Sequence, residues 1–401
     1  MATILFAWEL GGGLGHIGRI RPVAERLVAE GHRVVVAAAH LPAAGHVSLS
    51  PSIELVQAPL TTAANHSVRF EARSFAELLW HAGFQNVAQL ALAVHQWQSL
   101  FDTLTADLVV ADHAPTALLA LRERSERRVV WGTGFCCPPI EFPLRDLRPW
   151  LPSANESLVE RESQVLRAIN EVLAQQHLQQ LSSVAQLYQQ VDDTLLTTYP
   201  ELDHYANRDQ ARYWGVWSSG DGALPRWPEG HGPKLFAYVK PDSEAREALL
   251  AAVGYGCRLL VFDPENRFAD LASPQAVVTS QRLDLAAVGA TADLALGNAT
   301  HALSAQLLLS GVPLIVMPRS LEQWLLAQRL AAAKLGVALL AQPAKQLPSA
   351  ISFALSHGPL RQAVAEFSSR YRSVTKLDRC QIVADHLSSI ASNLNRSAEP
   401  Q

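Results

Sequence analysis

The chain has 401 residues, of which 49% are hydrophobic and 17% charged, a composition that suits a globular protein with more than one apolar core. The net charge is −4 and no dense run of lysine and arginine is present, so we expect no nucleic-acid partner. No apolar run reaches the roughly 18 residues of a membrane span, and no basic segment followed by an apolar run opens the chain.

The four cysteines are scattered and form no C-x-x-C pair. Two of them, Cys136 and Cys137, are adjacent, which is a poor geometry for an ordinary structural disulfide. We therefore expect reduced thiols and a cytoplasmic protein without a transmembrane segment.

The first half of the chain alternates apolar β-type runs with helical patterns, and the first helix keeps its apolar residues on one face. Such alternation predicts a parallel sheet with helices on both faces. The expected elements are strands at 4–8, 33–39, 108–111 and 128–132, and helices ending at Gly31 and spanning 75–103 and 115–124.

The middle of the chain has a different composition and no strand–helix alternation. Residues 151–192 are rich in Gln, Glu and Leu and lack turn signals, which predicts one or two long amphipathic helices, with a short strand after them. Residues 214–234 are dense in Gly, Pro and Ser, as linkers are. The alternating pattern then restarts, with strands expected at 235–239, 258–262, 276–279, 294–296, 313–317 and 337–340, and helices at 243–253, 283–290, 302–310 and 321–335.

These patterns divide the chain into two parallel-sheet domains. We expect an N-terminal domain at 1–215, a linker at 216–232, a C-terminal domain at 233–375, and a C-terminal helix with a tail at 376–401 that packs back toward the N-terminal domain. Open parallel sheets bind ligands beyond the carboxyl ends of their strands, so we expect a ligand-binding site at that edge of each sheet.

The glycine-rich turn after the first strand allows two interpretations. Residues 13–18 match G-x-G-x-x-G, which in a dinucleotide-binding protein is accompanied by an acidic residue at the end of the second strand. That strand instead ends in Ala39-His40. The alternative gives a function to His16, because an imidazole at the mouth of a helix can take a proton from a bound molecule near neutral pH.

Asp112 is a candidate partner for this histidine. It ends the predicted strand at 108–111 and would lie on the same sheet edge as His16. A carboxylate beside an imidazole sets its tautomer and stabilises the imidazolium. Asp112 equally suits the cap of the helix that begins at Pro115, and the residues leave both roles open.

Three segments resemble a known family. GGGLGHIGRIRPVAERLVAEGHRVVV and DLVVAD are similar to the start and the Asp-bearing strand of GT-B-fold glycosyltransferases, particularly the family of UDP-glucuronosyltransferases and antibiotic glycosyltransferases. GNATHALSAQLLLSGVPLIVMPRSLEQWLLAQRL resembles that family's donor signature. The resemblance covers most of the chain except 40–105 and 136–232, and implies an α/β fold of two Rossmann-like domains facing an interdomain cleft.

The resemblance also implies roles by position. His16 would be the base that deprotonates the acceptor, with Asp112 as its partner, and the helix starting near Thr300 would present its N-terminus to a diphosphate. Asn298 stands where the family has a histidine, so Lys240 or His301 is a candidate for the missing positive charge. The expected donor-binding residues are Gly15, Lys240, Gln281, Asn298, Ala299, Thr300, His301, Glu322 and Gln323.

The expected function is an inverting, metal-independent glycosyltransferase that uses a UDP- or dTDP-linked sugar as co-substrate and no other cofactor. No Asp-x-Asp metal motif is present. The aromatic residues Trp80, Phe84, Phe135 and Phe142 favour a small or lipophilic acceptor. The protein is expected to be a monomer or a homodimer, and the alternatives are a nucleotide-sugar epimerase of the same fold or a non-catalytic nucleotide-sugar-binding protein.

Overall fold

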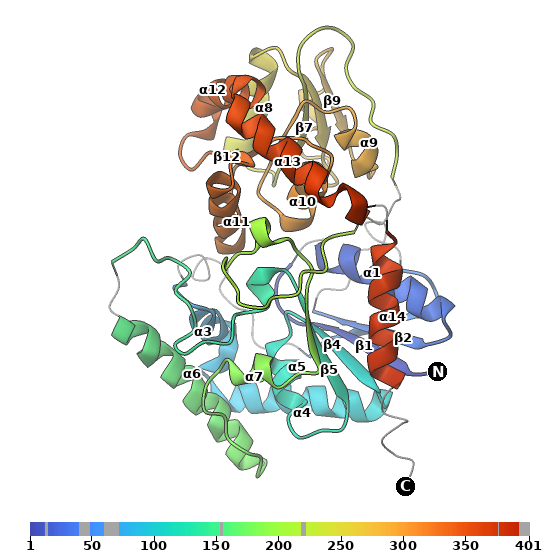
Figure 1. Cartoon of the computed structure of the whole chain (residues 1–401), viewed down its shortest axis with the longest axis vertical. Helices are drawn as coiled ribbons and strands as arrows, with labels where there is room; N and C mark the ends of the chain where they lie inside the picture. The colour runs from blue at the N-terminus through green and yellow to red at the C-terminus, as the bar shows by residue number, and fades with distance from the viewer. Residues whose placement is uncertain are drawn as a thin grey trace. The chain divides into compact units, whose positions relative to one another are not determined.

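The computed structural model describes residues 1–12, 15–39, 49–59, 72–152, 155–217, 222–375 and 377–392. The chain forms two compact units, one made of Met1–Gly215 with Arg379–Gln401 and the other of Val216–Asp378. Each unit is built on a six-stranded sheet whose neighbouring strands run parallel, with helices packed against it (Figure 1). The predicted fold class, α/β with two Rossmann-like parallel sheets, is confirmed.

The sheet of the first unit has the strand order β3-β2-β1-β4-β5-β6. Its central strands β1 and β4 are nearly continuous apolar runs, as strands covered on both faces should be. Their register pairs Trp8 with Asp112, so the two strands end side by side. The strands are β1 Thr3–Trp8, β2 Arg33–Ala38, β3 Ile53–Gln57, β4 Leu108–Asp112, β5 Arg127–Gly132 and β6 Asp193–Leu196; the helices are α1 Gly15–Ala29, α3 Phe75–Leu79, α4 Val87–Leu104, α5 Pro115–Ala120, α6 Asn155–Gln175 and α7 Gln186–Gln189.

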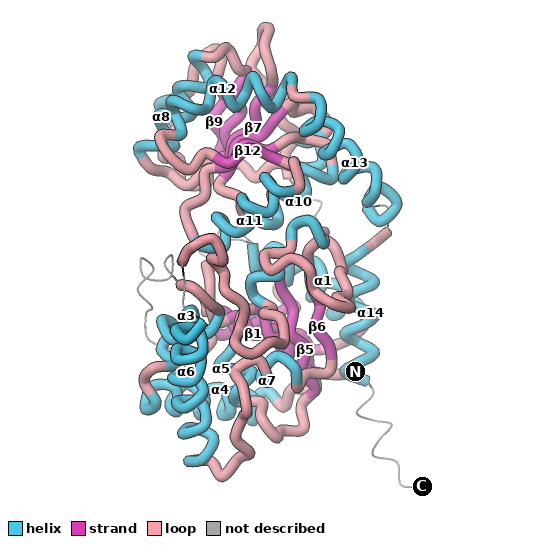
Figure 2. The backbone as a smooth tube through the Cα atoms, turned by 60° about the vertical axis from the view of Figure 1, so that its left-hand side comes forward, coloured by secondary structure: helices cyan, strands magenta, loops and turns pink. Residues whose placement is uncertain are grey.

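The last helix of the chain, α14 (Arg379–Ser392), belongs to the first unit and lies beside α1 (Figures 1 and 2). Two histidines attach it. His32 Nε2 lies 2.8 Å from Ser388 Oγ, and His386 Nε2 lies 2.7 Å from Asp193 Oδ2 at the start of the edge strand β6. A segment from the far end of the sequence thus completes the first unit.

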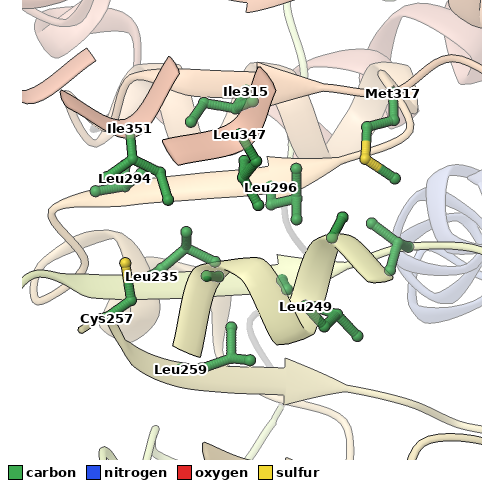
Figure 3. Close-up of a cluster of buried hydrophobic side chains, with 14 of the residues drawn as sticks. Leu235, Leu249, Cys257, Leu259, Leu294, Leu296, Ile315, Met317, Leu347 and Ile351 are labelled. Atoms are coloured by element: carbon green, nitrogen blue, oxygen red, sulfur yellow. The ribbon is translucent and has the colours of Figure 1, made fainter. Parts of the chain in front are cut away.

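The second unit repeats the plan with the strand order β12-β11-β10-β7-β8-β9. One layer of its core packs leucine and isoleucine side chains of the central strands against Leu347 and Ile351 of α12 (Figure 3). Burial of each such side chain contributes about 1.5–3 kcal/mol. The strands are β7 Lys234–Tyr238, β8 Arg258–Phe262, β9 Ala276–Thr279, β10 Leu294–Gly297, β11 Leu314–Val316 and β12 Gly336–Ala338; the helices are α8 Ser243–Gly254, α9 Leu285–Gly289, α10 His301–Leu309, α11 Leu321–Ala332, α12 Pro343–Ser356 and α13 Gly358–Thr375.

The sequence-based elements fail in two places. The helix predicted over 75–103 is interrupted by a π-helical turn at Trp80–Phe84, because Gly83 adopts a φ of 106° and Asn86 caps a new helix by accepting from the backbone N–H of Gln89. Strand β3 was not predicted, since this edge strand buries only its first residue. In the described part of the chain, no helix combines the length and apolarity that crossing a membrane requires.

Candidate active site

The paired histidine and aspartate lie at the carboxyl end of the first sheet. His16, near the start of α1, has its Nδ1 3.0 Å from Oδ1 of Asp112, the last residue of β4. Asp112 has no exposed surface, whereas 13% of the His16 side chain is exposed. Because Nδ1 faces the carboxylate, Nε2 is the nitrogen left for exchange with a ligand. Two residues of the glycine loop, at positions 13 and 14, lie outside the described residues.

Arg19 is a third member of this cluster that the sequence analysis missed. Its Nη2 lies 2.7 Å from each carboxylate oxygen of Asp112. Burial alone would raise the pKa of Asp112, but the charges and hydrogen bonds of Arg19 and His16 outweigh burial and hold the pKa well below its usual range. The sequence contained a signal for this role, because Arg19 follows His16 by three residues and therefore lies on the same face of the helix.

Two neighbours fix the imidazole ring itself. Trp8 stacks on His16 with ring centroids 5.0 Å apart and an interplanar angle of 16°, and the indole N–H of Trp8 donates to the carbonyl of Leu10. Gly11 has a φ of 85°, and a Cβ at this position would lie 2.8 Å from Nε2 of His16. Only glycine satisfies both the backbone angle and the close approach of the ring.

Glu9 joins the turn after β1 to the turn after β4. Its buried carboxylate accepts through Oε2 from the backbone N–H groups of Thr116 (2.9 Å) and Ala117 (3.3 Å), while Oε1 has no hydrogen-bond partner. Burial raises the pKa of Glu9 to about 7, although the side chain of Thr116 and the two backbone N–H groups lower it. The backbone N–H of Leu10 also donates to the carbonyl of His113 (2.9 Å).

His113 was also missed, although it directly follows Asp112. It is 9% exposed and has a φ of 50°, an uncommon conformation for a residue other than glycine. Its ring lies 6.5 Å from that of His16 at an interplanar angle of 22°, and 6.0 Å from that of Phe135 at 82°. A second imidazole therefore stands beside the first.

The four predicted acceptor residues occupy different environments. Phe135 contacts His113 and is 6% exposed, and its backbone N–H donates to Nδ1 of His204. Phe142 is 58% exposed, whereas Phe84 has no exposed surface and packs in the core. Trp80 lies under the guanidinium of Arg161, 4.5 Å from the ring centroid. Phe84 thus offers no surface to an acceptor.

The predicted donor residues of the second unit follow the carboxyl ends of its strands. Asn298, after β10, has a structural role that the sequence did not suggest: its Oδ1 accepts from the backbone N–H of Lys240 (2.5 Å) and its amide donates to the carbonyl of Met317 (2.6 Å). It thereby ties together the ends of β7, β10 and β11. The backbone of Lys240 is held by this amide, and its side chain is exposed.

The turn that leads into α10 contains the other candidates for binding a diphosphate. Ala299 has a φ of 57° and is 2% exposed, and His301, the first residue of the helix, is 7% exposed. Thr300 occupies the N-cap position without capping the helix, and its buried Oγ1 has no hydrogen-bond partner. The first N–H groups of a helix likewise have no partner within the helix.

The remaining donor candidates of the second unit lie on the same edge of its sheet, whereas Gly15 is the first residue of α1 in the first unit. Gln281 follows β9 and is exposed, and its N–H donates to Oγ1 of Thr279. Glu322 and Gln323 stand in the first turn of α11 and are half-buried; the side chain of Gln323 accepts from the N–H of Arg319, so it helps to start the helix. Among the described residues, no group of three or more His, Cys, Asp and Glu side chains is arranged to hold a metal ion.

Comparison with known proteins shows the fold. No family model matches the sequence, and no curated protein matches it. Solved structures do match along nearly the whole chain: the calicheamicin glycosyltransferase CalG4 (18% identity, TM-score 0.69, 99% of each chain covered) and the glycosyltransferase SnogD from Streptomyces nogalater (18%, 0.64, 97% of this chain and 99% of that chain). The spinosyn rhamnosyltransferase SpnG complexed with thymidine diphosphate also matches (18%, 0.65, 93% and 96%).

The chain therefore has the GT-B fold, in the form found in antibiotic glycosyltransferases, as the resemblance in the sequence implied. At these sequence identities the likeness concerns the fold, and the function has to be argued from the residues.

The buried carboxylate of Glu9 predicts a pH-dependent stability. Its pKa of about 7 in the folded protein exceeds the 4.5 of an unperturbed glutamate, so the folded state holds a proton that the unfolded state has lost between these pH values. Stability from this group is complete below pH 4.5 and falls by about 3 kcal/mol as the pH rises through 7. Glu9→Gln lacks this loss. Between pH 5 and pH 8, the free energy of unfolding measured with urea should therefore fall less in the variant than in wild type. A difference between the two proteins that does not change with pH would contradict the assignment.

Alanine variants of Gly11 and Gly12 test the contact between Gly11 and the His16 ring, with Gly12 as the matched control. Gly11→Ala places a methyl group against Nε2 of His16 on a backbone angle that costs about 1–2 kcal/mol, whereas a Cβ at Gly12 has open space around it. We expect Gly11→Ala to lower stability and shift the NMR signal of the His16 ring. Gly12→Ala should leave both unchanged, and equal effects in the two variants would refute the contact.

Proposed function

We propose that this protein transfers a glycosyl group from a nucleotide-diphosphate sugar to a hydroxyl group of a small or lipophilic acceptor, with inversion at the anomeric carbon. The observation that carries the proposal is the contact between His16 and the fully buried, ionised Asp112 at the carboxyl end of the first sheet. A base held by a carboxylate at a ligand-binding edge is what deprotonation of an alcohol requires.

The reaction would be a single displacement. Nε2 of His16 takes the acceptor's hydroxyl proton while the oxygen forms a bond to the anomeric carbon. The bond from that carbon to the diphosphate oxygen breaks, and the diphosphate leaves with the electron pair. Asp112 stabilises the imidazolium that forms, and Trp8 and Gly11 keep the ring in place.

The donor diphosphate would bind at the start of α10. There the helix dipole, the first backbone N–H groups of the helix and the Thr300 hydroxyl suit an anion. SpnG has been solved with thymidine diphosphate, which supports a dTDP- or UDP-linked donor here. We propose that these groups stabilise the leaving diphosphate without a metal ion.

Loss of the base tests the function. His16→Ala should reduce glycosyl transfer about 100- to 10,000-fold, the usual contribution of general-base catalysis, while nucleotide binding stays intact. His95→Ala, on an exposed position of α4, is the control and should transfer at the wild-type rate. A fully active His16→Ala protein would exclude this mechanism, and inhibition by excess EDTA would exclude metal independence.

Thr300 tests the donor site. Because its hydroxyl is buried without a partner, Thr300→Val should leave the ligand-free protein as stable as wild type or more so. The variant should nevertheless bind UDP or dTDP about 10- to 100-fold more weakly, since a hydrogen bond to a charged oxygen is lost. Calorimetric titration measures this, with Ser310→Ala at the opposite end of α10 as control. Unchanged affinity in Thr300→Val would place the diphosphate elsewhere.

A further inference from the structure

His113 is held in a conformation that the chain would not adopt without support. A φ of 50° costs a non-glycine residue on the order of 1–2 kcal/mol, although histidine tolerates it better than most residues. The turn is fixed on both sides, by the bond from Leu10 N–H to the His113 carbonyl and by the contacts of Glu9 with Thr116 and Ala117. Strain that is maintained in this way is typical of functional positions.

One ring nitrogen of His113 and one of His16 lie close to the same glycine. A Cβ on Gly11 would lie 2.8 Å from Nε2 of His16 and 3.5 Å from Nδ1 of His113. Phe75 and Phe135 bound the ring of His113, with centroids 6.1 and 6.0 Å away. Apolar walls strengthen a hydrogen bond made at such a place.

We propose that His113 is a second imidazole that binds the acceptor's reacting oxygen, an inference that rests on the proposed function. The acceptor's O–H donates to Nε2 of His16, and an N–H of His113 donates to one lone pair of the same oxygen. The other lone pair forms the bond to the anomeric carbon. His16 ends with the acceptor's proton, His113 keeps its own, and the diphosphate leaves with the electron pair of the broken bond.

An acidic acceptor therefore distinguishes the two histidines, because it should restore activity to a His16 variant and not to a His113 variant. An acceptor that is already ionised has no proton to lose, so it makes the base unnecessary, but its oxygen still has to be held. We therefore compare transfer from UDP- or dTDP-glucose to phenol, which is protonated at pH 8, and to 4-nitrophenol, which is mostly ionised. The variants are His16→Ala, His113→Gly and His113→Asn; glycine and asparagine both accept the positive φ.

His113→Gly should lose about tenfold to a hundredfold in kcat/KM with both phenols, the effect of one hydrogen bond to a charged oxygen. His16→Ala should lose heavily with phenol and little with 4-nitrophenol. His113→Asn, which offers an N–H, and imidazole added to His113→Gly should each restore part of the rate.

Three results would count against the inference. Wild-type kcat/KM in His113→Gly with both phenols would overturn it, while a loss in His16→Ala would leave the proposed function standing. A loss in His113→Asn equal to that in His113→Gly, with no effect of imidazole, would assign His113 a purely structural role. Full activity of His16→Ala with phenol would instead overturn the proposed function.

Discussion

A carboxylate cut off from water at the end of a central strand imposes a requirement on everything around it. Burying the charge of Asp112 costs several kcal/mol unless it is compensated, and the compensation comes from the guanidinium charge of Arg19 and the hydrogen bond to His16, on adjacent turns of α1. The helix must therefore start at the end of β1 and present this face to β4. The position of the candidate base is thus a consequence of electrostatic compensation as much as of packing.

The second constraint is the connection between the two turns that hold this cluster. Glu9 and Leu10 reach from the turn after β1 to the turn after β4, and the strand register brings Trp8 beside Asp112. Once both turns are fixed from several directions, the unfavourable backbone angle at His113 is tolerated, because it cannot relax without breaking the hydrogen bond from Leu10.

The parts of this arrangement that follow from local sequence were predictable. Buried central strands such as β1 and β4 read as apolar runs, and the rule that parallel strands end at one edge of a sheet brought His16 and Asp112 together. Edge strand β3 and the break near Gly83 were not predicted. An exposed strand lacks an apolar pattern, and one glycine does not disturb a helical period. Arg19 was accessible through its helical spacing. Glu9 and His113 were not, because their roles depend on contacts between residues about 100 positions apart.

The second unit carries the candidate donor site, in which a neutral amide has a structural role. At the position where the resemblance in the sequence implies a histidine, Asn298 uses both ends of its amide to bond the backbone at the ends of neighbouring strands. In the proposed reaction, the groups placed to stabilise the departing diphosphate are the first backbone N–H groups of α10 and the Thr300 hydroxyl. The backbone dipoles are fixed by the fold before any ligand arrives, which suits a group whose negative charge increases as the glycosidic bond breaks.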